Sequence, residues 1–143
     1  MSVDTLFEGL KNILEIMNNL VPWGLEVESN FWNLTFRGIC SFVATNNELI
    51  FTDQVRDINE KPNLGFNITK NFLLYLLEDG FKIEFKQTYR GSLVDFTLMI
   101  ICEGHCLKIK VYDIDYDVAK EALEKITKEI YKIRGVRESR EGD

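Results

Sequence analysis

Apolar residues recur at helical spacing in two segments, one near each end of the chain. Residues 4–20 form the first amphipathic helix, and Pro22 ends it. Its apolar stripe consists of Leu6, Leu10, Ile13, Leu14 and Met17. Residues 116–134 form the second, with a stripe of Val118, Ala119, Ala122, Leu123, Ile126, Ile130 and Ile133. Both patterns are typical of helices that cover one face of a sheet.

Alternating apolar and polar residues predict the strands. In the first half they lie at Leu25–Glu28 and in a hairpin of Ile39–Thr45 and Leu49–Thr52, which is followed by a polar loop at 53–65. In the second half they lie at 81–85, 93–101 and 107–111. Short turns between strands favour antiparallel pairing. We therefore predict an α+β fold, with an antiparallel sheet of about five to six strands packed with three helices. Residues 1–134 form the single domain, and 135–143 a charged, flexible tail.

The third predicted helix, residues 67–79, is apolar on every side. Asn67 is its expected N-cap, and Gly80 follows its end. A surface helix normally has a polar face, so this one is either deeply buried or covered by a second chain. One sheet covers only one side, which predicts a homodimer through this helix. The interface candidates are Phe72, Leu73, Leu74, Tyr75 and Leu77, together with the aromatic residues Trp23 and Trp32.

Charge and composition narrow the classes of partner. The 143 residues suffice for one domain with a sizeable core, and the net charge is −6. The excess acid lies in the first half of the chain, and no basic stripe is present, which argues against nucleic acid and membrane surfaces as partners. No signal peptide or long apolar span is recognisable. Three cysteines, Cys40, Cys102 and Cys106, fit reduced thiols in the cytoplasm.

Candidate chemistry is sparse. Cys102, His105 and Cys106 could bind zinc, but the spacing is unusual and Cys40 would have to supply the fourth ligand. We favour a tight hairpin in which Gly104 has a positive φ and the cysteines pack as small apolar residues. No metal or other cofactor is therefore expected. His105, the only histidine, has no nucleophile elbow beside it.

The order of elements resembles the Roadblock family, the dynein light-chain type of regulatory domain. The segment 41–51 resembles the first hairpin of that family, residues 67–79 its second helix, and residues 107–115 with the last helix its final strand and helix. The resemblance implies a homodimer whose second helices pair. It also implies a non-enzymatic role, either binding and regulating a small Ras-like GTPase or scaffolding a complex. Residues 22–37 are an aromatic insertion relative to this family, and an added strand there would also suit the secretion-chaperone-like fold.

Three functional hypotheses follow. The first is a non-enzymatic, dimeric binding or scaffold module. The second is a small enzyme or ligand-binding domain with an acidic pocket formed by Glu26, Glu28 and Asp95. A third hypothesis is a protein of archaeal or viral origin with a function of its own. We expect the first, and hence no catalytic residue.

Overall fold

The computed structural model describes residues 2–31, 35–54 and 65–141. The helices are α1 (Val3–Leu20), α2 (Lys70–Asp79) and α3 (Tyr116–Glu141). The strands are β1 (Leu25–Ser29), β2 (Phe36–Ala44), β3 (Glu48–Asp53), β4 (Gly65–Thr69), β5 (Lys82–Arg90), β6 (Leu93–Cys102) and β7 (His105–Asp115). The predicted α+β fold with three helices and an antiparallel sheet is confirmed.

The sheet has seven strands in the order β4-β3-β2-β1-β7-β6-β5, and every neighbouring pair is antiparallel. The prediction of five to six strands was therefore too low. The additional strand is β4, in a segment assigned to a loop and a helix start because Gly65 and Asn67 favour turns. Pairing with β3 overrides these local preferences, since Phe66 lies opposite Phe51 and Ile68 opposite Leu49.

The start of the second helix also differs from the prediction. Lys70 is its first residue and Thr69 its N-cap, because the Thr69 hydroxyl accepts a hydrogen bond of 3.2 Å from the Phe72 N–H. Asn67 lies instead in β4, where its side-chain amide donates to Glu48 Oε2 at 3.0 Å. The segment of about thirteen residues predicted as one helix is thus a strand followed by a ten-residue helix.

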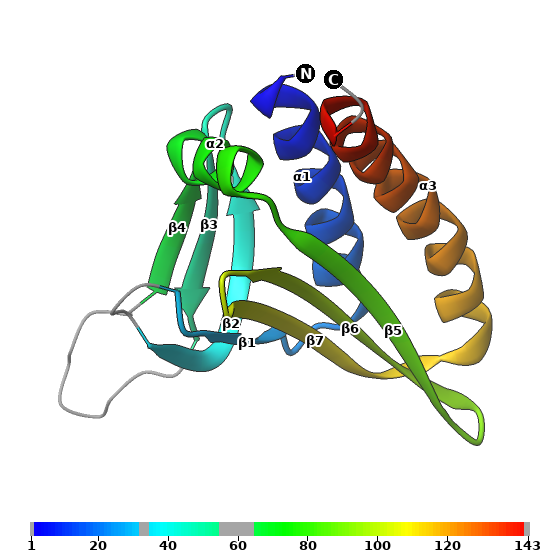
Figure 1. Cartoon of the computed structure of the whole chain (residues 1–143). Coiled ribbons are helices and arrows are strands. Elements are labelled where there is room, and N and C mark those ends of the chain that lie inside the picture. Colours follow the sequence, from blue (N-terminus) through cyan, green and yellow to red (C-terminus); the bar gives the residue numbers. More distant parts are fainter. Residues whose placement is uncertain (1, 32–34, 55–64, 142–143) are drawn as a thin grey trace, which may run out of the picture.

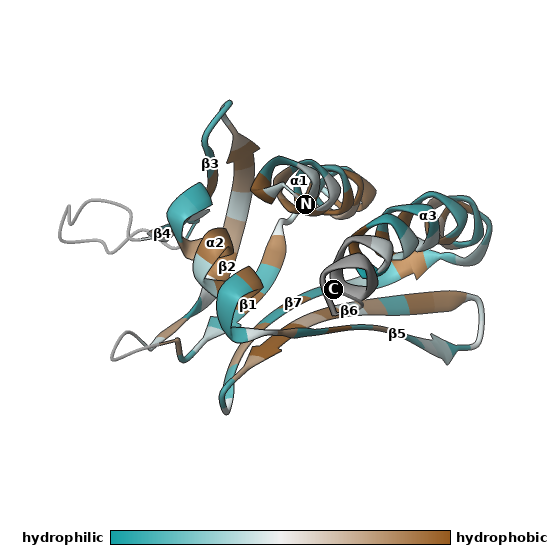
Figure 2. Cartoon of the chain, turned by 45° about the horizontal axis from the view of Figure 1, so that its top comes forward, coloured by the Kyte–Doolittle hydropathy of each residue, from teal (hydrophilic) through white to brown (hydrophobic). Residues whose placement is uncertain are grey.

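Helices α1 and α3 lie side by side over one face of the sheet (Figure 1). Their approach is close at Gly9, where an added Cβ would lie 2.7 Å from Ile133 Cγ1. Hydrophilic residues follow the side of α3 that is turned away from the sheet (Figure 2). The core between helices and sheet includes the fully buried Phe7, Leu10 and Phe96. None of the helices described here combines the length and apolar composition that a bilayer span requires.

Helix α2 directly follows β4 and contacts α1, on the side of α1 that is turned away from α3 (Figure 1). Its position brings the edge strand β4 close to the end of β1 and the start of β7, although β1 lies three places away in the sheet. The space between these segments forms a mostly apolar cavity.

Candidate functional site

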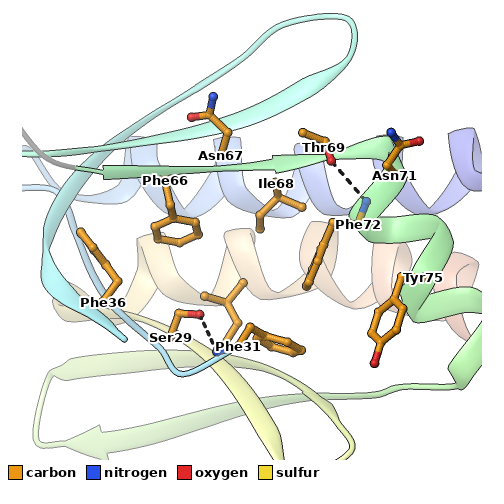
Figure 3. A pocket seen from close by; sticks show the side chains of 11 residues that line it. Ser29, Phe31, Phe36, Phe66, Asn67, Ile68, Thr69, Asn71, Phe72 and Tyr75 are labelled. Atoms are coloured by element: carbon orange, nitrogen blue, oxygen red, sulfur yellow. Dashed lines mark hydrogen bonds between the residues drawn. The ribbon is translucent and has the colours of Figure 1, made fainter. Parts of the chain in front are cut away.

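This cavity has a volume of about 380 Å³ and lies between β4 and α2 on one side and β1, β2 and β7 on the other. Figure 3 shows Phe66, Ile68 and Phe72 directed into it from β4 and α2. Phe31, Phe36 and Ser29 lie across from them. Its other lining residues are Asn67, Thr69, Asn71, Tyr75 and Leu107. A volume of this size suits one or a few apolar side chains or a small ligand.

A row of aromatic rings joins the two sides of the cavity. Phe36 and Phe66 have ring centroids 5.1 Å apart, and Phe66 stacks on Phe51 with centroids 4.8 Å apart. Phe51 in turn lies 5.2 Å from Phe42. Phe42 and Phe51 are buried, whereas Phe36 and Phe66 are half-buried. The inner rings therefore hold the two rings that face the cavity in a fixed geometry.

A second aromatic group also joins the two sides of the cavity. Phe31 meets Phe72 edge to face, with ring centroids 5.2 Å apart, and stacks on the His105 ring at 5.6 Å. His105 Nδ1 lies 2.8 Å from the carbonyl oxygen of Asn30, which ties the β6–β7 hairpin to the loop after β1. Residues 25–31 are thus positioned by contacts with β7 as well as with β2.

One end of the cavity is acidic. The Tyr75 hydroxyl donates a hydrogen bond of 2.8 Å to Glu103 Oε2. Hydrogen bonds to Glu103 and Asp79 raise the pKa of Tyr75 above its ordinary value, because ionisation would place a third negative charge beside two carboxylates. The last turn of α2 carries Glu78 and Asp79 and no basic residue. This end of the cavity therefore disfavours an anionic ligand.

Six of the seven predicted interface residues are described, and they lie in three different environments. Leu73 and Leu77 belong to the core of the same chain, with exposed fractions of 0% and 5%. Phe72 and Tyr75 are half-buried and line the cavity. The exposed residues are Leu74 (44%) and Trp23 (49%). Trp32 lies outside the described residues.

Helix α2 is not deeply buried, since one of its sides is exposed in the single chain. Its exposed positions are Asn71, Leu74, Glu78 and Asp79. Because Asn71, Leu74 and Glu78 follow helical spacing, α2 has an outer face that is mostly polar, with Leu74 as its apolar member. A dimer through α2 stays a prediction, supported by less apolar surface than the sequence pattern suggests.

The cysteine-histidine cluster is divided between the two faces of the sheet. Cys102 pairs with His105, and Cys106 pairs with Ile101, so the two thiols point to opposite faces. Cys102 Sγ donates to the carbonyl oxygen of Gly80 at 3.0 Å. Gly104 has φ +79°, as the hairpin interpretation predicted. No three His, Cys, Asp or Glu side chains in the described part of the chain gather as potential metal ligands.

The thiols are also poorly suited to nucleophilic chemistry. Burial raises the pKa of Cys40 to about 12, and the nearby Asp53 adds to this effect. Burial raises the pKa of Cys102 and of Cys106 as well. Since the thiolate is the reactive form, all three side chains are largely protonated near neutral pH.

The residues of the proposed acidic pocket face basic partners. Glu26 lies opposite Lys110 and Glu28 opposite Lys108 in the pairing of β1 with β7. Glu28 also forms an ion pair of 3.4 Å with Arg37. Opposite charges across neighbouring strands are typical of a solvated sheet face. This arrangement lends no support to an acidic pocket, which stays a prediction.

Asp95 has a structural role beside a β-bulge. It accepts hydrogen bonds from Arg90 at 2.9 Å and from the N–H of Asp113 at 3.0 Å. Asp113 has φ +59°, a conformation unusual for a residue with a Cβ. Burial raises the pKa of Asp95, but the two hydrogen bonds and the charge of Arg90 outweigh it, so the pKa lies below its ordinary value. The carboxylate therefore stabilises the bulge between Val94 and Phe96.

We expect Asp95→Asn to lower the free energy of unfolding by about 1 kcal/mol at pH 7. A depressed pKa contributes stability above the unfolded-state value of about 3.9, and this contribution is lost as the pH falls through the folded-state value. The difference from the native protein should therefore shrink below about pH 4. Urea unfolding between pH 3 and 7 measures it, with Glu8→Gln on exposed α1 surface as the control. A loss that stays constant over this pH range would contradict the assigned role.

Phe66 and Ile68, which line the cavity from β4, were not among the sequence candidates. The alternation of Phe66 and Ile68 was a usable signal for a strand with one apolar face. No sequence signal placed that strand beside residues 29–31. The four strands before α2 also exceed the single hairpin implied by the Roadblock resemblance, which stays a prediction.

Comparison of this chain with known families, curated proteins and solved structures supplies no relative from which a function could be transferred. No family model matches it, no curated protein matches it, and no solved structure matches it.

Proposed function

We propose that this chain is a non-enzymatic binding module whose binding site is the aromatic groove between β4, α2 and the end of β1. The observation that carries this proposal is the apolar cavity of about 380 Å³, with rings contributed by β2, β4, α2 and the loop after β1. Burying an apolar side chain of a ligand there contributes about 1.5–3 kcal/mol. The raised pKa values of the thiols favour binding over covalent chemistry.

Toluene, a mimic of an apolar aromatic side chain, tests whether the groove accepts such a group. We expect its NMR titration to shift resonances of residues that line the cavity. Phe66→Ser should weaken binding by roughly tenfold or more, because the ring lines the cavity. Tyr131→Ser is the matched control, since Tyr131 is an aromatic residue on α3 with an exposed fraction of 65%. Shifts that are absent, or equal in both variants, would refute the groove as a binding site.

The Roadblock resemblance adds a homodimer and a small Ras-like GTPase as proposed partners, in the cytoplasm. The structural feature that favours self-association through α2 is Leu74, with an exposed fraction of 44%. We expect light scattering to give the mass of a dimer for the native chain and of a folded monomer for Leu74→Glu. Leu77 is left unchanged because it is buried, and a charge there would unfold the domain. A native monomer at every concentration would remove the support for this mode of association.

A further inference from the structure

Strand β4 is one edge of the sheet. Among the described residues its hydrogen-bonded neighbour is β3, on one side only. An edge strand has a row of backbone N–H and C=O groups that its own sheet does not use. Edge strands can therefore pair with a further polypeptide segment.

The register identifies which groups of β4 point away from β3. The N–H of Thr45 donates to the carbonyl oxygen of Glu48 at 2.9 Å, so Glu48 directs its backbone groups to β2. Because successive residues alternate, Leu49 and Phe51 direct theirs to β4. Their partners Ile68 and Phe66 point back to β3. The groups of Gly65, Asn67 and Thr69 consequently point outward.

The hydrogen bond from the Gln54 N–H to the carbonyl oxygen of Ile39, at 2.8 Å, supports this alternation. Gln54 is six residues after Glu48 and so faces β2 by the same rule. The assignment of outward groups thus rests on a hydrogen bond at each end of the β2–β3 pair.

The aromatic cavity lies against the face of β4 that carries Phe66 and Ile68. Four consecutive residues, 66–69, contribute to its wall, although alternate side chains of a strand point to opposite faces. Figure 3 shows the side chain of Asn67 pointing away from the cavity, so its contribution comes from the backbone. The groove therefore offers backbone hydrogen-bonding groups beside a pocket for an apolar side chain.

We propose that the groove binds an extended segment of a partner polypeptide, which adds to β4 as an eighth strand and inserts an apolar side chain among Phe36, Phe66 and Phe72. This inference rests on the proposed function and specifies its ligand. Repeated N–H and C=O groups at strand spacing match a polypeptide backbone and have no counterpart in a hydrocarbon chain. Glu103 and Asp79 at the Tyr75 end disfavour a fatty acid carboxylate or an anionic lipid.

The probe is a capped heptapeptide in which threonine and leucine alternate, with a lysine at each end for solubility. Two further peptides carry N-methyl groups, one on its leucines and the other on its inner threonines. In a strand, the N–H groups of alternate residues lie on opposite edges, so each methylated peptide blocks one edge. Calorimetric titration should show that one methylated peptide binds like the parent and the other roughly tenfold or more weakly.

Asn67→Pro tests the same pairing from the protein side. It removes an outward N–H while leaving the hydrogen bonds to β3 intact, which proline permits on an edge strand. Asn67→Ala is the matched control, because it also loses the side-chain contact with Glu48 but keeps the N–H. We expect roughly tenfold weaker peptide binding for the proline variant relative to the alanine variant. The methylated peptides decide the question if the proline variant is unfolded.

The possible outcomes separate this inference from the proposed function. Equal binding of the two methylated peptides, or equal binding by the two Asn67 variants when both fold, would overturn strand addition. Binding of toluene without binding of any peptide would leave the groove as an apolar site and also overturn strand addition. A native dimer that Asn67→Pro dissociates would identify the added strand as a second copy, which contradicts a separate partner. Failure of toluene and all peptides would refute both proposals.

Discussion

Replacement of Phe51 by alanine is expected to lower the free energy of unfolding by about 3–5 kcal/mol. Phe51 has an exposed fraction of 1% and packs between Phe42, at 5.2 Å, and Phe66, at 4.8 Å. Its removal deletes the largest buried side chain of β3 and leaves a cavity that strands β2 and β4 cannot close without losing their register.

Chemical denaturation measures this loss, and Val43→Ala is the control on the adjacent strand. Val43 lies on the opposite face of the sheet with an exposed fraction of 59%, so its truncation should change stability by about 0.5 kcal/mol or less. Similar losses for the two variants would mean that the aromatic row is not part of the core. Because Phe51 supports Phe66, the folded fraction of Phe51→Ala should also bind toluene more weakly.

Replacement of Leu73 by alanine is expected to lower the free energy of unfolding by about 2–5 kcal/mol. The same replacement of its neighbour Leu74 should lower it by about 0.5 kcal/mol or less in the monomer. The two leucines are adjacent in sequence and identical in chemistry. Leu73 has an exposed fraction of 0% and Leu74 of 44%. The difference is therefore a direct measure of which side of α2 packs against the domain.

Thermal and chemical unfolding of Leu73→Ala and Leu74→Ala provide the measurement. A loss for Leu74→Ala as large as that for Leu73→Ala would show that a second surface covers the outer side of α2. If that loss depends on protein concentration, the covering surface is another copy of the chain. This comparison thus also bears on the proposed homodimer.

The elements of the second half of the fold could be located from the sequence, although β5 ends five residues and β7 four residues later than predicted. Strands β5, β6 and β7 follow segments with clear alternation or with a continuous apolar run, and the turn at Glu103 and Gly104 separates the last two. Helix α1 begins and ends within one residue of its predicted range. The backbone of α3 continues to Glu141, beyond the predicted end at residue 134. No proline follows residue 134, and Gly135 lowers the stability of a helix by only about 1 kcal/mol, so the helix passes through it.

Strand β4 and the groove were harder to predict from the sequence. Five residues with Gly65 and Asn67 among them satisfy a turn, a helix start and a short strand almost equally well. Pairing with β3 decides between these alternatives, and that pairing is a contact between segments distant in the sequence. The proximity of Phe31 to Phe72 likewise depends on how β1 lies against β7.

The sequence by itself determined the α+β class, the helices at the two ends and most of the strands, because periodicity records which side of each element is apolar. It could not determine what covers each apolar side. Leu73 and Leu74 are equivalent in the sequence, and only the tertiary structure assigns one to the core and the other to the surface. The groove was decided in the same way, since it forms where β4, α2 and the end of β1 meet, and burial depends on contacts between such separate segments.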